Sequence, residues 1–494
     1  MSDDAVSGGV DRRSFVAAGL AAAVVPGVAR AQVTTAGVDM AQWTPEYISG
    51  LAGTAEYDTA AECARVVPLN TAGRLSYWYV GPNQASPQIE HDIDAEFWAA
   101  FAKTYPNIKV TKQNLDYNEM LNKSRTAALG KAAPMVAKFP ILWGVEFAAK
   151  GQLSEFGPEQ VGYGRNEFWP GALKSVTWKG KTYGVPTNNE TMALIWNAGL
   201  FKDAGLDPEK PPATWNDLVA YSKQIKEKTG KNGYGMVARV NAGNTPFRYM
   251  PQCWAYGGGA LDEAEAAPGY KAIFANNAGS KAALQASFDM YVRDKSVPVS
   301  ALTNTQTENQ DPFIAGQLAM MISHPSEYAA MLDRAKKATG DDKRTAEAVV
   351  ANMRYGLIPM GPARRAVVFG GSNAHVFHPS LVEGGLDMAA AKAFIAFATG
   401  PEWSTKLAWV SSNPGNIRGF RTKWMKQRLE TIKFLSVTTS MLPNGIPFPV
   451  LPQSAEIMNI IIPNMLQNAL TGKMTVAAAT DDAAKKIKEL LADL

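Results

Sequence analysis

The chain of 494 residues carries 49 Lys and Arg against 45 Asp and Glu, a formal net charge of +4. So small a bias does not favour binding to nucleic acid or to a lipid surface, and a chain this long is expected to form two or more domains. Its two cysteines, Cys63 and Cys253, are too few for an iron–sulfur or c-type haem site. We expect two separate buried thiols, although the spacing alone does not exclude a disulfide.

The first 31 residues have the pattern of an export signal. Arg12-Arg13 comes just before an apolar run at residues 16–25, Pro26-Gly27 ends that run, and small residues precede a cleavage site after Ala31. A cationic head, an apolar segment of about 7–15 residues and such a site are typical of a secretory signal rather than a membrane span. The arginine pair resembles the Tat signal. We therefore expect residues 1–31 to be removed and the mature protein to be periplasmic; the alternative is an accidental Arg-Arg before a buried helix.

Residues 32–72 form a polar lead with one expected helix, at residues 58–67. A β-rich run at residues 75–80 is followed by Ile93, Phe97 and Phe101, whose four-residue spacing predicts an amphipathic helix. A second strand begins at residue 108. Strand, helix and strand with short connections predict a βαβ unit and hence a parallel sheet.

The later elements follow the same kinds of signal. Thr214 is expected to cap a helix that ends at Gly230, and Ser280 is expected to cap another helix. The other strands are predicted at residues 181–186, 192–196, 318–323 and 355–359, with a polar run at 187–191 between the first two, and the other helices at 389–398, 402–410 and 476–494.

Six segments in consistent order resemble the family 1 extracellular solute-binding proteins of ABC importers, which include the maltose-binding protein. They are Phe97 to Val110; Gly180-Lys-Thr-Tyr-Gly-Val-Pro186 with Ile195-Trp-Asn197, Leu200-Phe-Lys-Asp-Ala-Gly-Leu206 and Pro211-Pro-Ala-Thr-Trp215; Phe313-Ile-Ala-Gly-Gln-Leu-Ala-Met320; Tyr355-Gly-Leu-Ile-Pro-Met-Gly-Pro362 with Gly370-Gly-Ser372; Pro401-Glu-Trp403; and Asn413-Pro-Gly-Asn-Ile-Arg418. The likeness covers about residues 73–494, and residues 32–72 lie outside it.

The resemblance implies an α/β protein with the two-lobed periplasmic binding protein fold, a hinge and an interlobe ligand cleft. The N-lobe would comprise residues 73–187 plus 374–418, and the C-lobe residues 188–373 plus 419–494. The chain would cross between them near residues 186–190, 371–374 and 418–420. Hinges of this kind consist of a few loop residues that absorb changes in φ and ψ.

The resemblance also implies a set of ligand-binding residues, for which turn or core roles are the alternatives. A sugar site needs aromatic faces together with planar hydrogen-bonding groups. The candidates are Asn83, Gln84, Asp116, Tyr117, Trp143, Glu190, Arg248, Trp254, Glu327, Tyr328, Ser372, Asn373 and Arg418. Two stacking aromatics of the maltose-binding protein are missing, near Glu327-Tyr328 and Glu456-Ile457. This disfavours a maltodextrin and favours a smaller polyol, a monosaccharide, a short glycoside or a polyol phosphate.

No motif for a cofactor or a metal emerges from the sequence. His375-x-x-His378 lacks the remaining ligands of a zinc site, and the phosphate-binding, dinucleotide and nucleophile-elbow motifs are missing. The resemblance therefore implies a monomeric binding protein, not an enzyme, which hands a carbohydrate or polyol to a membrane permease. The alternative is an exported hydrolase with two carboxylates, one of them Glu190.

Overall fold

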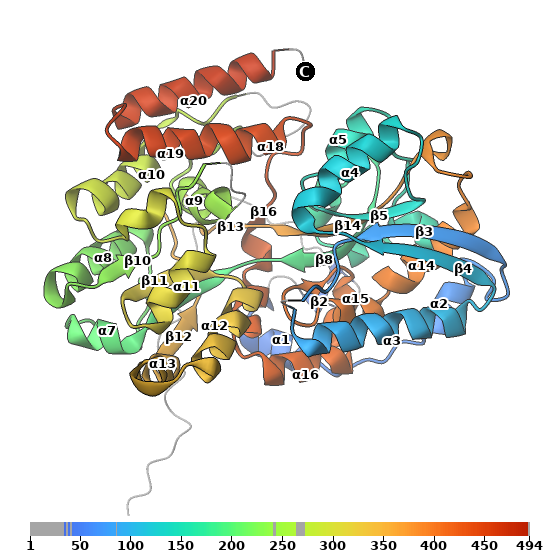
Figure 1. The fold of residues 1–494 in the computed structure, drawn as a ribbon, viewed down its shortest axis with the longest axis horizontal. Coiled ribbons are helices and arrows are strands. Elements are labelled where there is room, and N and C mark those ends of the chain that lie inside the picture. The colour runs from blue at the N-terminus through green and yellow to red at the C-terminus, as the bar shows by residue number, and fades with distance from the viewer. Residues whose placement is uncertain are drawn as a thin grey trace, which may run out of the picture. The chain divides into compact units, whose positions relative to one another are not determined.

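Two β-sheets of different size organise the chain from Thr34 onwards (Figure 1). The computed structural model describes residues 34–35, 38–39, 42–84, 86–240, 244–262 and 272–492. The expected export signal, at residues 1–31, lies outside these ranges. Within them, no helix has the length and apolar character needed to cross a membrane.

The larger sheet has six strands of mixed direction. Their order across the sheet is β15 (Asn413–Pro414), β8 (Val185–Glu190), β14 (Gly370–Val376), β5 (Val136–Pro140), β3 (Gly73–Tyr79) and β4 (Ile108–Asn114). Strand β3 is parallel to both β4 and β5, whereas β14 is antiparallel to β5 and β8, and β15 is antiparallel to β8. The predicted βαβ unit is therefore confirmed, but only one end of the sheet is parallel.

Two helices make the parallel connections of this sheet. The first, α3 (Gln88–Thr104), joins β3 to β4, and α4 (Tyr117–Leu129) joins β4 to β5. Phe97 and Phe101 of α3 are buried, as their spacing predicts, and their rings lie 5.5 and 5.4 Å from the ring of Phe397. Phe397 belongs to α14 (Met388–Thr399), which packs on β3 and β8. The apolar side of α3 thus packs against α14, and α14 in turn packs on the sheet.

The smaller sheet has four strands, in the order β10 (Asn232–Tyr234), β11 (Leu318–Ser323), β9 (Ala193–Asn197) and β12 (Met353–Gly356). Helix α8 (Trp215–Thr229) packs against β10 and β11. Its predicted ends are confirmed: Thr214 forms a capping box with Asp217, and Gly230 takes a left-handed conformation with φ of 73°.

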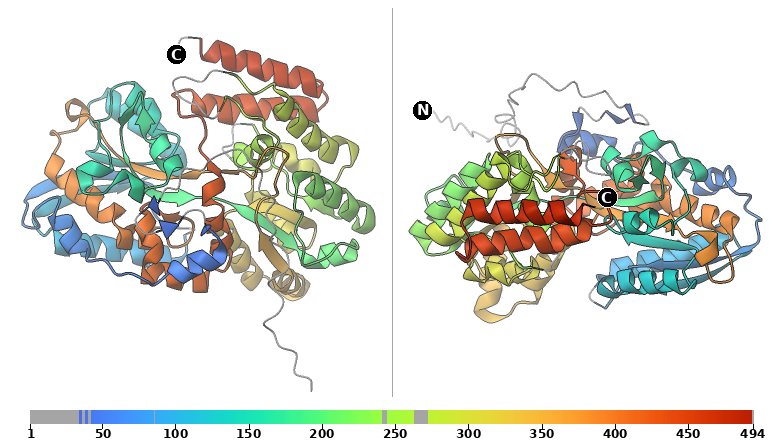
Figure 2. Two further views of the ribbon diagram at one scale, coloured as in Figure 1. Left: turned by 180° about the vertical axis from the view of Figure 1, so that it is seen from behind. Right: turned by 90° about the horizontal axis from the view of Figure 1, so that it is seen from above.

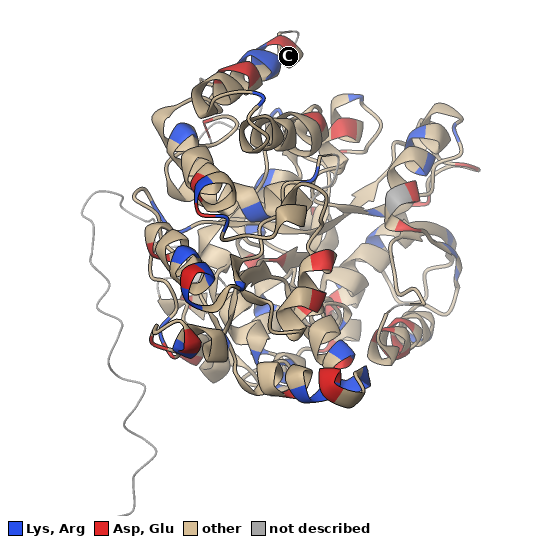
Figure 3. Cartoon of the chain, turned by 60° about the vertical axis from the view of Figure 1, so that its left-hand side comes forward, with Lys and Arg blue, Asp and Glu red and all other residues tan. Residues whose placement is uncertain are grey.

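The remaining strands pair as β1 (Thr34–Thr35) with β2 (Val38–Asp39), β6 (Thr177–Trp178) with β7 (Lys181–Thr182), and β13 (Val367–Val368) with β16 (Gly445–Ile446). The remaining α-helices are α1 (Pro45–Leu51), α2 (Thr59–Ala64), α5 (Gly144–Ala149), α6 (Pro170–Ser175), α7 (Ala198–Asp203), α9 (Asn244–Ala255), α10 (Ala278–Phe288), α11 (Thr307–Ile314), α12 (Pro325–Lys337), α13 (Gly340–Ala351), α15 (Pro401–Leu407), α16 (Lys423–Thr431), α17 (Phe434–Ser440), α18 (Ser454–Glu456), α19 (Ile462–Leu470) and α20 (Val476–Leu490). Helices α19 and α20 lie side by side in both views of Figure 2. Figure 3 shows cationic and anionic residues interspersed on the helices, in keeping with the near-balanced composition.

Two local predictions are wrong. The polar run expected between strands is itself mostly strand, because β8 continues through Glu190 with β14 on one side and β15 on the other. The cap of α10 is Asn277 rather than Ser280, since the Asn277 side chain accepts from the Ser280 backbone N–H. The Ser280 hydroxyl is instead buried and donates to the Phe274 carbonyl. In both cases tertiary hydrogen bonds outweigh the local sequence signal.

The lead segment packs against the body of the protein. Trp43 is buried, and its indole N–H donates to the Thr439 carbonyl oxygen over 2.9 Å. Its ring meets Trp169 and Phe420 edge-on, at 5.1 and 5.0 Å. Helix α1 packs on α17, and α2 packs on α14. The lead is therefore part of the core, although it lies outside the segments that carry the resemblance.

The two cysteines are buried at separate sites and form no disulfide. Burial raises the pKa of the Cys63 thiol to about 12, and the Cys253 sulfur lies 3.5 Å from the Ser280 hydroxyl. Neither side chain is in contact with water, so both act as core residues.

His375 on β14 is enclosed completely. Its Nδ1 lies 2.6 Å from the Tyr183 carbonyl oxygen, to which it donates, and Nε2 has no hydrogen-bond partner among the described residues. Burial lowers the pKa of His375 to about 4. The pKa of a histidine in the unfolded chain is about 6.5. Between pH 6.5 and pH 4 the unfolded chain therefore binds a proton at His375 that the folded protein does not bind. This contribution to stability is full above pH 6.5 and declines as the pH falls towards 4.

We therefore predict that the free energy of unfolding drops on acidification from pH 6.5 to pH 4, with His375 contributing on the order of 3 kcal/mol to the fall. Urea unfolding at several pH values measures it. The His375→Gln protein should show a shallower pH dependence over this range. His378, which is exposed, supplies the control: His378→Gln should keep the wild-type slope. Equal slopes for wild type and His375→Gln would contradict the prediction.

Candidate ligand-binding cleft

A cavity of about 340 Å³ opens at the carboxyl ends of β3 and β5. Its walls come from these strands, from β8 and β14, from α3, from the start of α4, from the end of α15 and the segment after it, and from Phe247 of α9. In open α/β sheets this edge is where ligands ordinarily bind. The volume lies near the lower end of the range of about 300–1,000 Å³ for small-molecule sites, which suits a small ligand.

Four aromatic side chains line the cavity: Tyr79, Tyr117, Phe247 and Trp409. Three are held by aromatic neighbours outside it. Tyr79 stacks on Tyr77 at 5.0 Å, Tyr117 lies 5.1 Å from Trp143, and Phe247 meets Phe448 edge-on at 5.1 Å. Supported aromatic faces of this kind can stack on the apolar C–H faces of a sugar or polyol.

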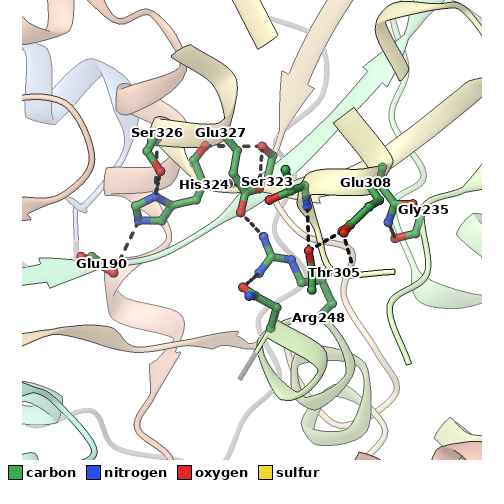
Figure 4. Close-up of polar contacts among 12 residues, drawn as sticks. Glu190, Gly235, Arg248, Thr305, Glu308, Ser323, His324, Ser326 and Glu327 are labelled. Atoms are coloured by element: carbon green, nitrogen blue, oxygen red, sulfur yellow. Dashed lines mark hydrogen bonds and ion pairs between the residues drawn. The ribbon is translucent and has the colours of Figure 1, made fainter. Parts of the chain in front are cut away.

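Two carboxylates at the cavity wall are held in place by hydrogen-bond donors. Asp94 of α3 accepts from the Tyr79 hydroxyl at 3.2 Å and from the Trp98 indole at 3.3 Å. Glu190, at the end of β8, accepts from the Asn188 amide at 3.2 Å. Its other oxygen lies 3.6 Å from Nε2 of His324 (Figure 4). These contacts leave further acceptor sites on both carboxylates for the hydroxyl groups of a ligand.

Lys138 lies among these acidic groups. It is on β5 and shares the cavity with Asp94, Glu190 and Glu90. Burial lowers the pKa of Lys138, and the charges of the three carboxylates oppose that effect. The cavity therefore presents a cation and several anions within one small volume.

Three of the residues expected to bind ligand line the cavity: Tyr117, Glu190 and Ser372. The Tyr117 side chain is half exposed. The pKa of its hydroxyl is nevertheless raised, first because the surrounding protein displaces water and second because Glu190 carries a negative charge. Three more lie next to lining residues. Asn83 and Gln84 are exposed in the turn after Gly81 and Pro82, and Asp116 is exposed beside Tyr117.

Two expected ligand-binding residues bind each other instead. Arg248 of α9 and Glu327 of α12 are both buried and form an ion pair (Figure 4). Arg248 also donates to the Asn244 side chain at 3.1 Å, and Glu327 accepts from the Ser323 hydroxyl and the His324 backbone, each at 3.2 Å. Neither lines the cavity, so their charges are used inside the protein.

The other five expected residues also lie outside the cavity lining. Trp143 is buried beneath Tyr117, Trp254 packs in the core against Phe448, and Tyr328 lies 5.1 Å from the ring of Phe434. Asn373 is buried and donates to the Ser175 hydroxyl. Arg418, in the 3-10 helix at Ile417–Arg421, pairs with Glu62 of the lead at 2.5 Å and with Glu167 at 3.3 Å.

Sequence reasoning missed Lys138, Asp94, Phe247, Trp409 and His324. Lys138 had a usable signal, because a lysine flanked by Ala137 and Phe139 in an apolar strand is costly to bury without a function. Asp94 lies on the predicted helix α3, whose exposed and cleft-facing polar residues look alike in sequence. Phe247, Trp409 and His324 reach the cleft region through tertiary packing, which no local pattern reports.

Solved structures with the same fold are two-lobed solute-binding proteins. The GacH receptor of Streptomyces glaucescens, solved unliganded and with acarbose, is 21% identical with a TM-score of 0.66, over 86% of this chain and 100% of its own. UgpB from Mycobacterium tuberculosis, solved with glycerophosphocholine, is 18% identical with a TM-score of 0.67, over 85% of this chain and 99% of its own. The fold class predicted from the sequence is thereby confirmed.

The profile of the bacterial extracellular solute-binding proteins matches residues 86–405, and the chain belongs to that family. The sn-glycerol-3-phosphate-binding periplasmic protein UgpB of Brucella abortus (strain 2308) is 30% identical over 155 residues, which is 30% of this chain and 35% of that protein. These relatives are binding proteins rather than enzymes. The lead and the segment after residue 405 lie outside the match.

The buried Arg248–Glu327 pair yields a prediction about stability. Removing one partner leaves an uncompensated buried charge, so Glu327→Gln should lower the free energy of unfolding by about 3–5 kcal/mol. Replacing both residues, as Arg248→Met with Glu327→Leu, should recover much of that loss because no buried charge remains. Urea denaturation measures both changes.

The exposed pair Arg344–Asp341 is the matched control. Asp341→Asn should change the stability by less than about 1 kcal/mol, since exposed ion pairs contribute little. A Glu327→Gln protein as stable as wild type would show that the pair does not carry the stability assigned to it.

Proposed function

We propose that this protein is the periplasmic solute-binding component of an ABC importer, which captures a sugar or related polyol in the cavity and delivers it to a membrane permease. The single observation that carries the proposal is the composition of the cavity. Supported aromatic faces and fixed carboxylates line the same small volume, and carbohydrate recognition requires this combination. Family membership supports the transport role, and we propose no catalytic step.

The proposal includes closure of two lobes around the ligand. We infer lobes of residues 73–187 plus 374–418 and residues 188–373 plus 419–494, with the lead attached to them. Glu190 is the residue best placed to connect a bound ligand to the second lobe. It lines the cavity at the end of β8 and also contacts His324, which caps α12 beside the smaller sheet. The boundary near residues 418–420 stays a prediction. It would assign α15 to the first lobe and α16 to the second, although these two helices pack on each other.

Binding of a neutral carbohydrate or polyol should reduce the radius of gyration measured by solution scattering. A ligand that makes more contacts with the closed form than with the open form shifts the equilibrium between the two towards the closed form. Glu190→Gln should weaken binding by about 1–3 kcal/mol through loss of a charge-assisted hydrogen bond, without unfolding the protein. The control is Glu347→Gln on α13, an exposed position outside the cavity. Wild-type affinity in Glu190→Gln would contradict the role of Glu190, and unchanged scattering at saturation would contradict closure.

We propose that export uses the Tat pathway, which reads the Arg12-Arg13 pair rather than the apolar run alone. Replacing both arginines by lysine keeps the charge and should leave precursor in the cytoplasm. Cell fractionation and immunoblotting measure the distribution. A Lys–Lys substitution at two arginines of the mature chain, Arg364 and Arg365, is the control. Normal periplasmic accumulation of the Arg12→Lys, Arg13→Lys protein would exclude Tat export while leaving a general secretory signal intact.

A further inference from the structure

The charges around the cavity are unequal in sign. Three carboxylates line it, those of Glu90, Asp94 and Glu190, together with two lysines, Lys138 and Lys406. No arginine is among the lining residues in the described part of the chain. Which of these charges remain available to a ligand depends on the partners that each already has.

Lys406 is already neutralised by another residue. Its ammonium group forms an ion pair with Glu96, which is outside the cavity lining, and lies 4.0 Å from the ring centroid of Trp424. Its side chain is 8% exposed. A cation held between a carboxylate and an aromatic ring has little remaining attraction for an anion.

Lys138 has no comparable partner. Its ammonium group forms neither a hydrogen bond nor an ion pair with any residue in the described ranges, although Glu190, Glu90 and Asp94 influence it through space. It is half-buried on β5, between the buried Ala137 and Phe139. A lysine that is partly removed from water without a paired acceptor has up to three N–H donors for a ligand.

The carboxylates outnumber the cations that oppose them. Asp94 has Lys112 at 3.6 Å, but Lys112 is 40% exposed and is screened by solvent. Among the described residues, Glu190 accepts a hydrogen bond from the Asn188 amide and lies near His324, and Glu90 adds a further negative charge. The N-terminus of α4 at Tyr117 would ordinarily favour an anion, but Asp116 and Glu119 already lie there. A phosphate group in the cavity would therefore be repelled.

We propose, building on the function proposed above, that the cavity selects uncharged polyhydroxylated ligands and excludes phosphorylated ones, with Lys138 as the specificity-determining donor. The hydroxyl groups of such a ligand donate to Asp94 and Glu190, and its oxygens accept from Lys138. A neutral polyol can satisfy both signs of charge at once, whereas the phosphate group of a phosphate monoester can pair with Lys138 alone and is repelled by the carboxylates. The chain thus differs in ligand class from its sn-glycerol-3-phosphate-binding relative.

Calorimetric titration of the wild-type mature protein tests the ligand class directly. The neutral probes are glycerol, sorbitol, glucose, trehalose and maltose, and the phosphorylated probes are sn-glycerol 3-phosphate, glycerophosphocholine and inorganic phosphate. We expect at least one neutral probe to bind and no phosphorylated probe to bind within tenfold of it. Tight binding of a phosphorylated probe alone would overturn this inference and leave the importer function standing. No binding by any probe of either class would count against both.

Variants test the role of Lys138. Lys138→Met keeps an unbranched side chain of nearly the same length and removes its donors, and should weaken binding of the neutral probe at least tenfold. Lys123→Met, an exposed position outside the cavity lining, should leave binding unchanged. The double variant Glu90→Gln, Glu190→Gln should raise the affinity for sn-glycerol 3-phosphate at least tenfold, because fewer carboxylates repel the phosphate group. This measurement does not depend on the stability of the Lys138 variant. Unchanged neutral-probe affinity in a folded Lys138→Met protein, or no gain for sn-glycerol 3-phosphate, would overturn the assignment.

Discussion

The antiparallel pairing of β8 with β14 is the constraint on which the site depends. The two strands pair with a shift of register between Ser372 and Asn373, and Gly371 has a φ of 131° that only glycine adopts without strain. A Cβ at Gly371 would collide with the Asn188 carbonyl oxygen. Ser372 pairs with Asn188 and Gly370 with Glu190, so Asn188, Glu190 and Ser372 share the face that lines the cavity, while Asn373, the next residue along β14, faces the opposite side and donates to the Ser175 hydroxyl. A one-residue slip of this pairing would move the polar residues of one strand to the face opposite the cavity.

Several buried and half-buried charges of the protein are satisfied by partners within the chain. Arg248 and Glu327 neutralise each other, Lys406 is neutralised by Glu96, and Arg418 joins Glu62 and Glu167. These pairs connect elements that are distant in the sequence, and their cost of desolvation is offset by contacts within the chain. Lys138 differs from these charges, since it faces carboxylates without forming an ion pair with any described residue. The distinction separates charges that hold the fold from the charge that is available to a ligand.

The relatives demonstrate how little a shared fold says about the ligand. One solved structure of this fold contains acarbose and another contains glycerophosphocholine, and each is aligned over at least 85% of this chain. At identities of 21% and 18%, the scaffold is retained while most of the residues differ. Ligand class has to be argued from the side chains themselves, because function resides in the site rather than in the fold. Here that means the aromatic faces and the balance between Lys138 and the carboxylates.

The sequence by itself determined the local elements and the fold class. Helix α3 followed from its apolar spacing and α8 from Thr214 and Gly230, because such signals act within a few residues; the ordered motifs indicated the two-lobed fold. Tyr117, Glu190 and Ser372, which line the cavity, could be predicted as ligand-binding candidates because they adjoin strands that the motifs had indicated. Only the tertiary structure decided that Arg248 binds Glu327, that Arg418 secures the lead, and that Lys138 and Trp409 share a cavity. The physical reason is that a side chain's role depends on the register and the face on which its strand or helix packs, and both are set by contacts between residues far apart in the chain.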